Sequence, residues 1–210
     1  THGSEIMPSQ AKIKWEIRYN NWNIFGLLSK ICGVVGFFLL IIHLVGIFSN
    51  HFKAKKFLTV GTALVALLFL AYSAGLAIRW YISGHAPWSN GYETMLYIGW
   101  ATLLSGFVFL KKSHITLAVT TILASLILMV AGMSWMNPEI TNLVPVLKSY
   151  WLIVHVAVIT ASYGFFGVAA LLGFLNLIIM MLRTPKNLKK ASFTIVELAL
   201  IIELALIVGL

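Results

Sequence analysis

The longest apolar run of the chain constrains its fold more than any other feature. It extends from Trp151 to Leu182, which is 32 residues without a charged side chain. A helix needs about 20 residues to cross a hydrocarbon core about 30 Å thick, and it rises about 1.5 Å per residue. The run is therefore longer than a bilayer requires. If Arg183 lies at the inner surface, His155 lies roughly 10 Å beyond the outer edge of the membrane.

The composition places the whole chain among multi-pass membrane proteins. Hydrophobic residues make up 60% of the sequence and charged residues only 10%, which is unlike soluble domains. Backbone polar groups must be satisfied within lipid, so the apolar stretches predict helices. We therefore predict an all-α, polytopic membrane helical bundle with about six transmembrane helices. The expected spans are about Ile31–Phe48, Phe57–Ile78, Tyr92–Leu110, Ile115–Trp135, Trp151–Leu182 and Ile195–Leu210.

The net charge of +9 is distributed unevenly over the connections between these stretches. Every second connection is basic, whereas the intervening ones carry one basic residue each, Arg79 and Lys148. Because short cytoplasmic loops are enriched in Lys and Arg, we expect the basic connections in the cytoplasm and the N-terminus outside. The charge thus indicates orientation in the membrane rather than nucleic-acid binding. The basic connections carry Lys53, Lys55, Lys56, Lys111, Lys112, Arg183, Lys186, Lys189 and Lys190.

Missing residues and motifs exclude several kinds of chemistry. The lone Cys32 forms neither an internal disulfide nor a CxxC redox pair. The sequence has no P-loop, HExxH, Ser-His-Asp arrangement or metal-spaced Cys/His cluster. Glu197 and Glu203 are six residues apart, so they lie on nearly opposite helix faces and do not form a proton relay. The sequence has no initiator Met, and its last span stops at Leu210 without a polar flank, so we expect an internal part of a longer polypeptide.

The expected outer loop between the second and third spans is rich in aromatic and polar residues. It contains Arg79, Trp80, Tyr81, His85, Trp88, Tyr92 and Glu93. Trp and Tyr concentrate at membrane interfaces, which explains them without any ligand. Alternatively, an aromatic wall with few polar groups suits a large planar cofactor, and both interpretations remain open on the residues alone. We expect Asn90 to cap the next helix, with Glu93 at the spacing of a capping box.

Two histidines in the apolar stretches need an explanation. A histidine near a helix end is usually interfacial or hydrogen-bonded, but neutral imidazole is also a common axial ligand of haem iron. Trp151 precedes His155 by four residues on the same helix face, suitably placed to pack against the edge of a macrocycle. His43 lies well inside the first span. A hydrogen bond to a neighbouring helix is the simpler explanation for it, and a second haem or a transport path is the alternative.

Two segments of the chain resemble the CcsA/ResC family of System II cytochrome c synthases, which are haem-handling membrane proteins. The first is Ser83–Glu93, with the sequence SGHAPWSNGYE, followed by Trp100. The second is Leu143–His155, with the sequence LVPVLKSYWLIVH. In addition, Tyr19–Phe25 looks like the junction in fused CcsBA proteins. Together these segments cover most of residues 15–183.

The resemblance implies an enzyme of the haem lyase type, a holocytochrome c synthase. Such an enzyme presents haem b at the outer membrane face and joins it by thioether bonds to the CxxCH motifs of apocytochrome c. The alternative function is a haem transporter or chaperone that forms no bond. His155 matches one of two external histidines that ligate the haem iron in this family. The other residues predicted to bind the cofactor are Trp151, Trp88, His85, Tyr92 and Glu93, and no catalytic residue is assigned.

The resemblance also implies partners, location and domain organisation. The expected partners are membrane lipid, apocytochrome c and a CcsB/ResB portion, either fused or separate, with no nucleic acid. The expected location is the bacterial inner (cytoplasmic) membrane, with the haem site on the periplasmic side. Residues 1–23 are expected to be an extracytoplasmic or linker segment, and residues 24–210 a CcsA-like haem-handling domain. The family's tryptophan-rich WWD loop and second external histidine are missing from the sequence, so we expect this chain alone to be inactive.

Overall fold

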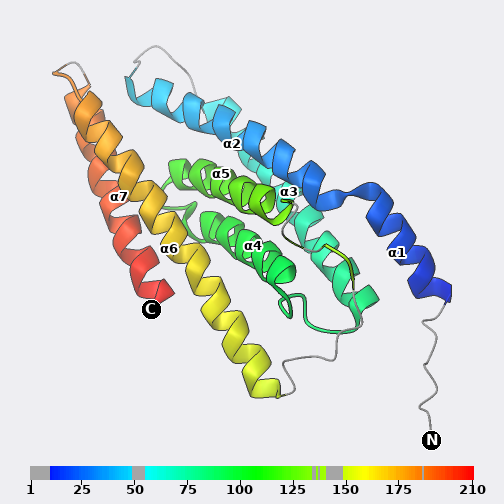
Figure 1. The fold of residues 1–210 in the computed structure, drawn as a ribbon. Coiled ribbons are helices and arrows are strands. Elements are labelled where there is room, and N and C mark those ends of the chain that lie inside the picture. The colour runs from blue at the N-terminus through cyan, green and yellow to red at the C-terminus, as the bar shows by residue number, and fades with distance from the viewer. Residues whose placement is uncertain (1–9, 49–54, 134–135, 137, 141–148, 186) are drawn as a thin grey trace, which may run out of the picture.

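A computed structural model describes residues 10–48, 55–133, 136, 138–140, 149–185 and 187–210. All regular secondary structure within these residues is α-helical (Figure 1). The prediction of an all-α bundle is therefore confirmed. The helices are α1 (Gln10–Trp22), α2 (Ile24–Phe48), α3 (Lys55–Ser83), α4 (Gly91–Phe109), α5 (His114–Ala131), α6 (Tyr150–Leu182) and α7 (Leu188–Gly209).

Five segments of the described chain are long and apolar enough to cross a membrane, which makes this a multi-pass membrane protein. They are Gln10–Phe48, Lys56–Ser83, His114–Ala131, Tyr150–Leu182 and Leu188–Gly209. About six spans were expected, and the difference is α4. This helix carries Glu93, Thr102 and Ser105, and all three side chains are buried within the protein rather than exposed to lipid.

Helix boundaries differ from the predicted ones at both ends of the chain. α7 begins at Leu188, seven residues before the expected start at Ile195. Residues 10–22, expected within a linker, form helix α1, which is followed by a break at Asn23. Asn23 has a φ angle of 41°, a left-handed conformation that Asn tolerates better than most residues. The break falls at the predicted domain boundary after residue 23, and the functional division there stays a prediction.

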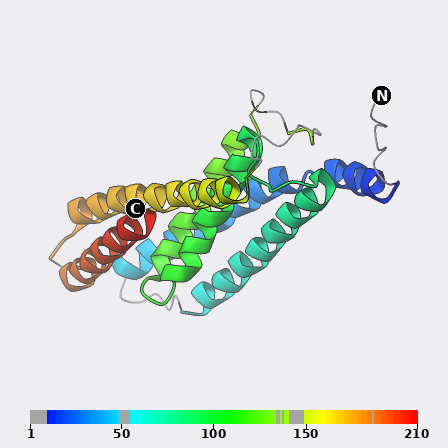
Figure 2. The same ribbon diagram turned by 90° about the horizontal axis from the view of Figure 1, so that it is seen from below.

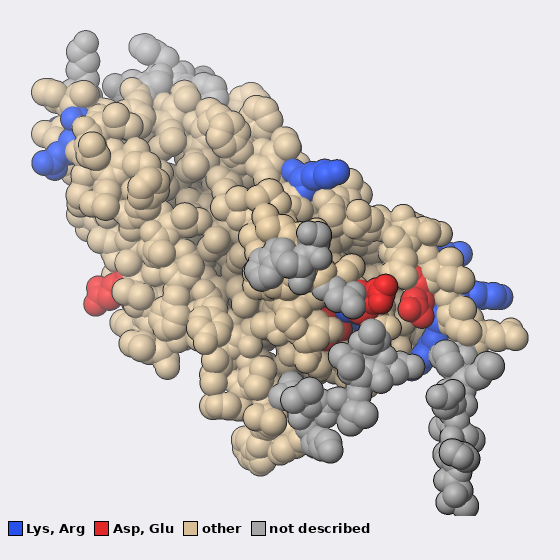
Figure 3. Space-filling model, viewed as in Figure 1, with Lys and Arg blue, Asp and Glu red and all other residues tan. Residues whose placement is uncertain are grey.

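From α2 to α7 the helices alternate in direction, so their ends gather at two ends of the bundle (Figure 1). The end of α2 and the start of α3, the α4–α5 connection, and the end of α6 and the start of α7 lie at one end, which we call the basic end (Figures 1 and 2). The α3–α4 loop, α1 and the start of α6 lie at the opposite end, which we call the aromatic end. The surface between them is mostly uncharged (Figure 3). The grouping of the basic connections agrees with the alternation of charge along the sequence.

α2 and α5 pack closely at the centre of the bundle. The hydroxyl of Ser29 donates to the backbone carbonyl of Ser125 at 3.0 Å, and the hydroxyl of Ser125 donates to the carbonyl of Ser29 at 2.7 Å. Gly36 permits this approach, because a Cβ there would be 2.9 Å from the backbone nitrogen of Ile122. Small residues and interhelical hydrogen bonds of this kind hold membrane helices together where the hydrophobic effect contributes little.

α6 packs against α4 through a glycine. A Cβ at Gly164 would lie 2.9 Å from the hydroxyl oxygen of Thr102 and 3.1 Å from its backbone nitrogen. Gly167 and Gly173 follow Gly164 on the same helix. A Cβ at Gly167 would lie 3.1 Å from Cδ2 of Leu123, whereas a Cβ at Gly173 would meet nothing within 4 Å. The close approach of the two helices is thus concentrated near Gly164, and the turns of α6 before it extend past α4 (Figure 1).

Candidate functional site

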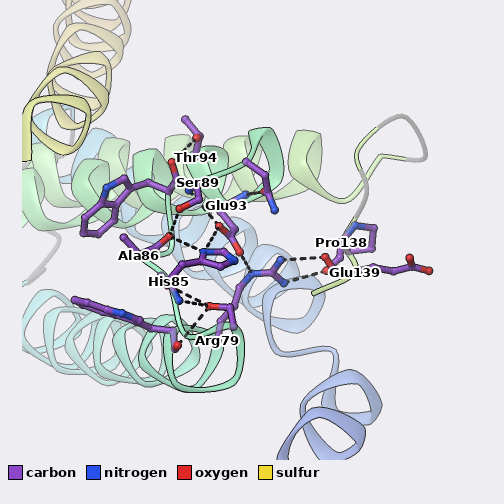
Figure 4. Close-up of polar contacts among 12 residues, drawn as sticks. Arg79, His85, Ala86, Ser89, Glu93, Thr94, Pro138 and Glu139 are labelled. Atoms are coloured by element: carbon purple, nitrogen blue, oxygen red, sulfur yellow. Dashed lines mark hydrogen bonds and ion pairs between the residues drawn. The ribbon is translucent and has the colours of Figure 1, made fainter. Parts of the chain in front are cut away.

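The aromatic end is organised around a buried ion pair between α3 and α4. The Nε of Arg79 lies 3.0 Å from Oε1 of Glu93, and the two side chains are 0% and 1% exposed. Buried charges are tolerated when each is paired and hydrogen-bonded. The remaining guanidinium nitrogens of Arg79 donate to the carbonyl oxygens of Pro138 at 2.9 Å and Glu139 at 3.5 Å. Figure 4 shows the guanidinium between Glu93 on one side and these two residues on the other.

The other carboxylate oxygen of Glu93 organises the α3–α4 loop. Oε2 accepts the backbone N–H of Ser89 at 3.1 Å, and it lies 3.7 Å from Nδ1 of His85. Asn90 caps α4 as predicted, since its Oδ1 accepts the N–H of Glu93 at 2.8 Å. The capping box differs slightly from the expected one, because Glu93 reaches the N–H of Ser89 rather than that of Asn90. His85 is half-buried, and its Nδ1 also lies 3.2 Å from the carbonyl oxygen of Ala86.

An apolar cavity of about 230 Å³ lies between α3, the loop and α4, and we call it the aromatic groove. The Trp88 ring packs at 4.8 Å from Tyr97 and 6.0 Å from Trp80, measured between centroids. Tyr97 in turn stacks on Trp100 at 5.9 Å. The groove is lined by Ser73, Leu76, Ala77, Trp80, Pro87, Trp88, Tyr97 and Trp100. Its volume is below the range of about 300–1,000 Å³ typical of pockets that enclose a cofactor, so it does not enclose a haem by itself.

Tyr92 lies on the other side of the ion pair. Its ring is 5.0 Å from the guanidinium carbon of Arg79, a cation–π contact. Tyr92 lines a second cavity of about 290 Å³ together with Tyr19 and Asn20 of α1 and with Glu139. Tyr92 and Trp88 therefore line different cavities, although the sequence suggested that they form one wall.

Trp88 joins the loop to α6. Its indole Nε1 donates a hydrogen bond of 3.2 Å to the backbone carbonyl of Ile153. Ile153 is half-buried, as are Val156 and Ala157, and Thr160 is buried, so these residues mark the face of α6 that is turned to the bundle. The loop therefore contacts the outer turns of α6 on their inward face.

His155 and Trp151 lie on the opposite face of α6. Successive helix residues are about 100° apart, so His155 is about 200° around the helix from Ile153. Both His155 and Trp151 are exposed, and the Trp151 side chain is 77% exposed. None of the described residues forms a hydrogen bond with the His155 ring. The structure therefore brings His85, Trp88 and Glu93 together, and it separates them from His155 and Trp151 by the width of α6.

His43 lies at the basic end, next to a histidine of α5. The rings of His43 and His114 are nearly parallel, at 15°, with their centroids 6.4 Å apart. His43 thus packs against a neighbouring helix through its ring, and the hydrogen bond expected for it stays a prediction. A role in binding a second haem stays a prediction.

Sequence reasoning missed two parts of this arrangement. It treated Arg79 as one basic residue of an outer loop, although it is fully buried, and it did not single out Tyr97 or Ile153. One signal was available for the ion pair. A single Arg and a single Glu flank a short loop at adjacent helix ends of an apolar chain, where an unpaired charge is costly.

The fold and these ends define a multi-pass α-helical membrane protein with an aromatic loop and an exposed histidine at the same end. Residues 88–210 match the family described as Cytochrome C assembly protein, which is more than half of the chain. The chain belongs to this family and is of the CcsA type, so the resemblance inferred from the sequence is confirmed.

Individual relatives agree with this membership. The protein NrfI of Wolinella succinogenes is 41% identical over 209 residues, which cover 99% of this chain and 23% of NrfI. A cytochrome c biogenesis protein CcsA of Prochlorococcus marinus (strain MIT 9303) is 38% identical over 143 residues, or 65% of this chain and 43% of that protein. The CcsA of Guillardia theta is 27% identical over 182 residues, or 84% of this chain and 60% of that protein. The chain thus spans less than two thirds of these relatives.

Proposed function

We propose that this chain is the part of a cytochrome c synthase that holds haem b at the aromatic end, with His155 as one axial ligand of the iron. Haem is the substrate here, and the complete protein joins it by thioether bonds to the CxxCH cysteines of apocytochrome c. Membership in the cytochrome c assembly family supports this general role. The specific assignment of His155 depends on its exposure and on its match to the family's external histidine.

The observation that carries the proposal is the exposed face of α6 formed by His155 and Trp151. An imidazole that has no partner among the described residues is available to ligate iron. Trp151 stands one turn earlier on the same face, so its ring flanks a macrocycle ligated by His155. A planar porphyrin docks more easily on such an open face than in the aromatic groove, which is too small to enclose it.

The loop residues have an indirect role in this proposal. The carboxylate of Glu93 is occupied by Arg79 and Ser89, so it has little capacity for a ligand. Trp88 and His85 lie on the inward side of α6, and their direct contact with haem stays a prediction, as does that of Tyr92. We infer that this loop supports the helix that presents His155. Among the described residues of the aromatic end, none is assigned as a general acid or base.

The proposal includes an orientation in the membrane. The basic end is assigned to the cytoplasm and the aromatic end to the periplasm, because cytoplasmic loops are enriched in Lys and Arg. The protein is then a multi-pass component of the bacterial inner membrane, with residues 1–23 outside. Its proposed partners are apocytochrome c, membrane lipid and a CcsB/ResB portion. The second axial ligand and the WWD surface are attributed to parts of the complete protein other than residues 1–210.

The test is a His155→Gly substitution in the full-length protein, expressed in cells that lack other cytochrome c assembly factors. We expect the variant to lose haem and synthase activity and to regain part of both with added imidazole, which fills the space left by the side chain. His114→Ala, at the basic end, is the matched control and should leave both unchanged. Unaltered haem content and activity in His155→Gly would refute the ligand role.

The same experiment distinguishes a cytochrome c synthase from the alternative function, a haem transporter or chaperone. If the full-length protein binds haem through His155 but yields no covalent cytochrome c, the protein is a haem transporter or chaperone. Haem staining of a reporter apocytochrome after denaturing electrophoresis makes this distinction, because only thioether-linked haem stays with the polypeptide.

A further inference from the structure

The outer turns of α6 make few contacts with the rest of the bundle. Tyr150, Trp151, Leu152 and Val154 are exposed, as is His155. Helix ends with few buried contacts and many exposed side chains open readily. Something must therefore hold this segment if His155 is to have a fixed position.

Among the described residues, the indole of Trp88 supplies a side-chain hydrogen bond between the α3–α4 loop and this segment. The bond reaches the carbonyl of Ile153, only two residues before His155. Because this carbonyl lies on the face opposite to His155, the bond fixes the rotation of the helix about its own axis. A helix pinned at Ile153 directs Trp151 and His155 away from the bundle.

Trp88 itself is held firmly. The hydroxyl of Ser89 donates to the carbonyl of Ala86 at 2.8 Å, and the hydroxyl of Thr94 donates to the carbonyl of Trp88 at 3.4 Å. The N–H of Ser89 is bound by Glu93, whose carboxylate is paired with Arg79. A continuous series of contacts thus runs from the buried ion pair through the loop to α6.

We propose that Trp88 is a positioning residue, whose Nε1–H holds the outer turns of α6 in the rotation that presents His155 to haem. This inference rests on the proposed function, since it takes His155 as the iron ligand. It differs from the sequence-based prediction for Trp88, in which the indole ring contacts the cofactor. The ring packs in the aromatic groove on one side of α6, whereas His155 faces the other side.

The test uses Trp88→Phe in the full-length protein, purified in lipid nanodiscs. Phe keeps an aromatic ring in the groove and removes the Nε1–H donor. Tyr72→Phe is a matched control, because the buried Tyr72 hydroxyl donates to a helix carbonyl at 2.7 Å, that of Leu96 on α4 rather than one on α6. Each substitution removes one aromatic donor to a helix carbonyl. A general loss of stability should therefore affect both variants alike.

Two measurements are made on each variant. Amide hydrogen exchange over residues 150–157 should rise about fivefold in Trp88→Phe, which corresponds to the loss of one ordinary hydrogen bond. Exchange over residues 150–157 should not change in Tyr72→Phe. The dissociation constant for added haem b should also increase about fivefold in Trp88→Phe. The electron paramagnetic resonance spectrum of ferric haem, which reports the orientation of the axial ligand, should broaden only in that variant.

The outcomes separate this inference from the proposed function. If His155→Gly loses haem but Trp88→Phe resembles the wild type in exchange, haem affinity and spectrum, the positioning role is wrong and the ligand role stands. If Trp88→Phe and Tyr72→Phe alter the same segment equally, the effect is general and the positioning role is also wrong. If Trp88→Phe raises exchange but His155→Gly keeps its haem, the contact anchors α6 and the proposed function fails.

Discussion

Arg79 of α3 and Glu93 of α4 form an ion pair, with 3.0 Å between Nε and Oε1. The Arg79 side chain is 0% exposed and the Glu93 side chain 1%. Glu93 lies 14 positions after Arg79 in the sequence, and the aromatic loop lies between them. The pair closes this loop at its base, and the same guanidinium binds the carbonyls of Pro138 and Glu139. Three segments of the chain therefore meet at one side chain.

Breaking this pair should be strongly destabilising. We expect Glu93→Ala to lower the free energy of unfolding by about 3–5 kcal/mol, because it leaves the Arg79 charge buried without its partner. Glu93→Gln, which still accepts hydrogen bonds, should cost less. The measurement is unfolding of the purified protein in mixed micelles with increasing SDS. Glu203→Ala is the control, since Glu203 is exposed on α7. An equal loss of unfolding free energy in Glu93→Ala and Glu203→Ala would contradict a stabilising role for the Arg79–Glu93 ion pair.

The glycines of α6 should respond differently to the same substitution. Gly164→Ala places a methyl group against the backbone of α4, and we expect it to destabilise the protein by about 1–3 kcal/mol. Gly173→Ala meets open space and should stabilise the helix by up to about 1 kcal/mol through its higher helix propensity. The SDS unfolding assay measures both variants. The two substitutions should change the free energy of unfolding in opposite directions. A change in the same direction would contradict the close contact between α4 and α6 at Gly164.

The reciprocal serine bonds between α2 and α5 should be energetically coupled. Ser29→Ala and Ser125→Ala each remove one of two hydrogen bonds, and each should cost about 0.6 kcal/mol, the average for interhelical bonds in membranes. The double variant should cost less than the sum, because the first substitution already loosens the helix contact. Thr62→Ala removes a bond within one helix, to the carbonyl of Leu58, and serves as a control. Strict additivity of Ser29→Ala and Ser125→Ala would argue against coupling.

The orientation in the membrane is open to a direct labelling test. Cys32 is the single cysteine of residues 1–210, so Cys32→Ala removes the only thiol from this part of the protein. In this background, Gly91→Cys at the aromatic end should react with a membrane-impermeant maleimide in intact spheroplasts. Lys112→Cys at the basic end should react only after permeabilisation. The reverse pattern would invert the proposed topology.

The helical architecture was largely predictable, because helices in lipid must be long, apolar and internally hydrogen-bonded. The run Trp151–Leu182 matches α6 to within one residue. The role of α4 was harder to infer. Its polar residues Thr102 and Ser105 are buried against other helices, and hydropathy does not distinguish such burial from exposure to an aqueous interface.

The candidate site was predictable only in part. The position of Asn90 as a helix cap follows from local spacing, and the structure confirms it. The separation of Trp88 from His155 does not follow from spacing, because it depends on how α6 is rotated against a loop more than 60 residues away in sequence. Long-range contacts of this kind, including Arg79 with Pro138, leave no local pattern.

The tight approach at Gly164 has a mechanical consequence for the outer part of α6. His155 lies nine positions before Gly164, so about 13 Å of helix separates it from the point where α6 packs against α4. If α6 tilted by about 5° at Gly164, His155 would move by about 1 Å, which is enough to misalign a reacting centre. Under the proposed function, the spacing between α4 and α6 at Gly164 would therefore set the position of a porphyrin ligated by His155.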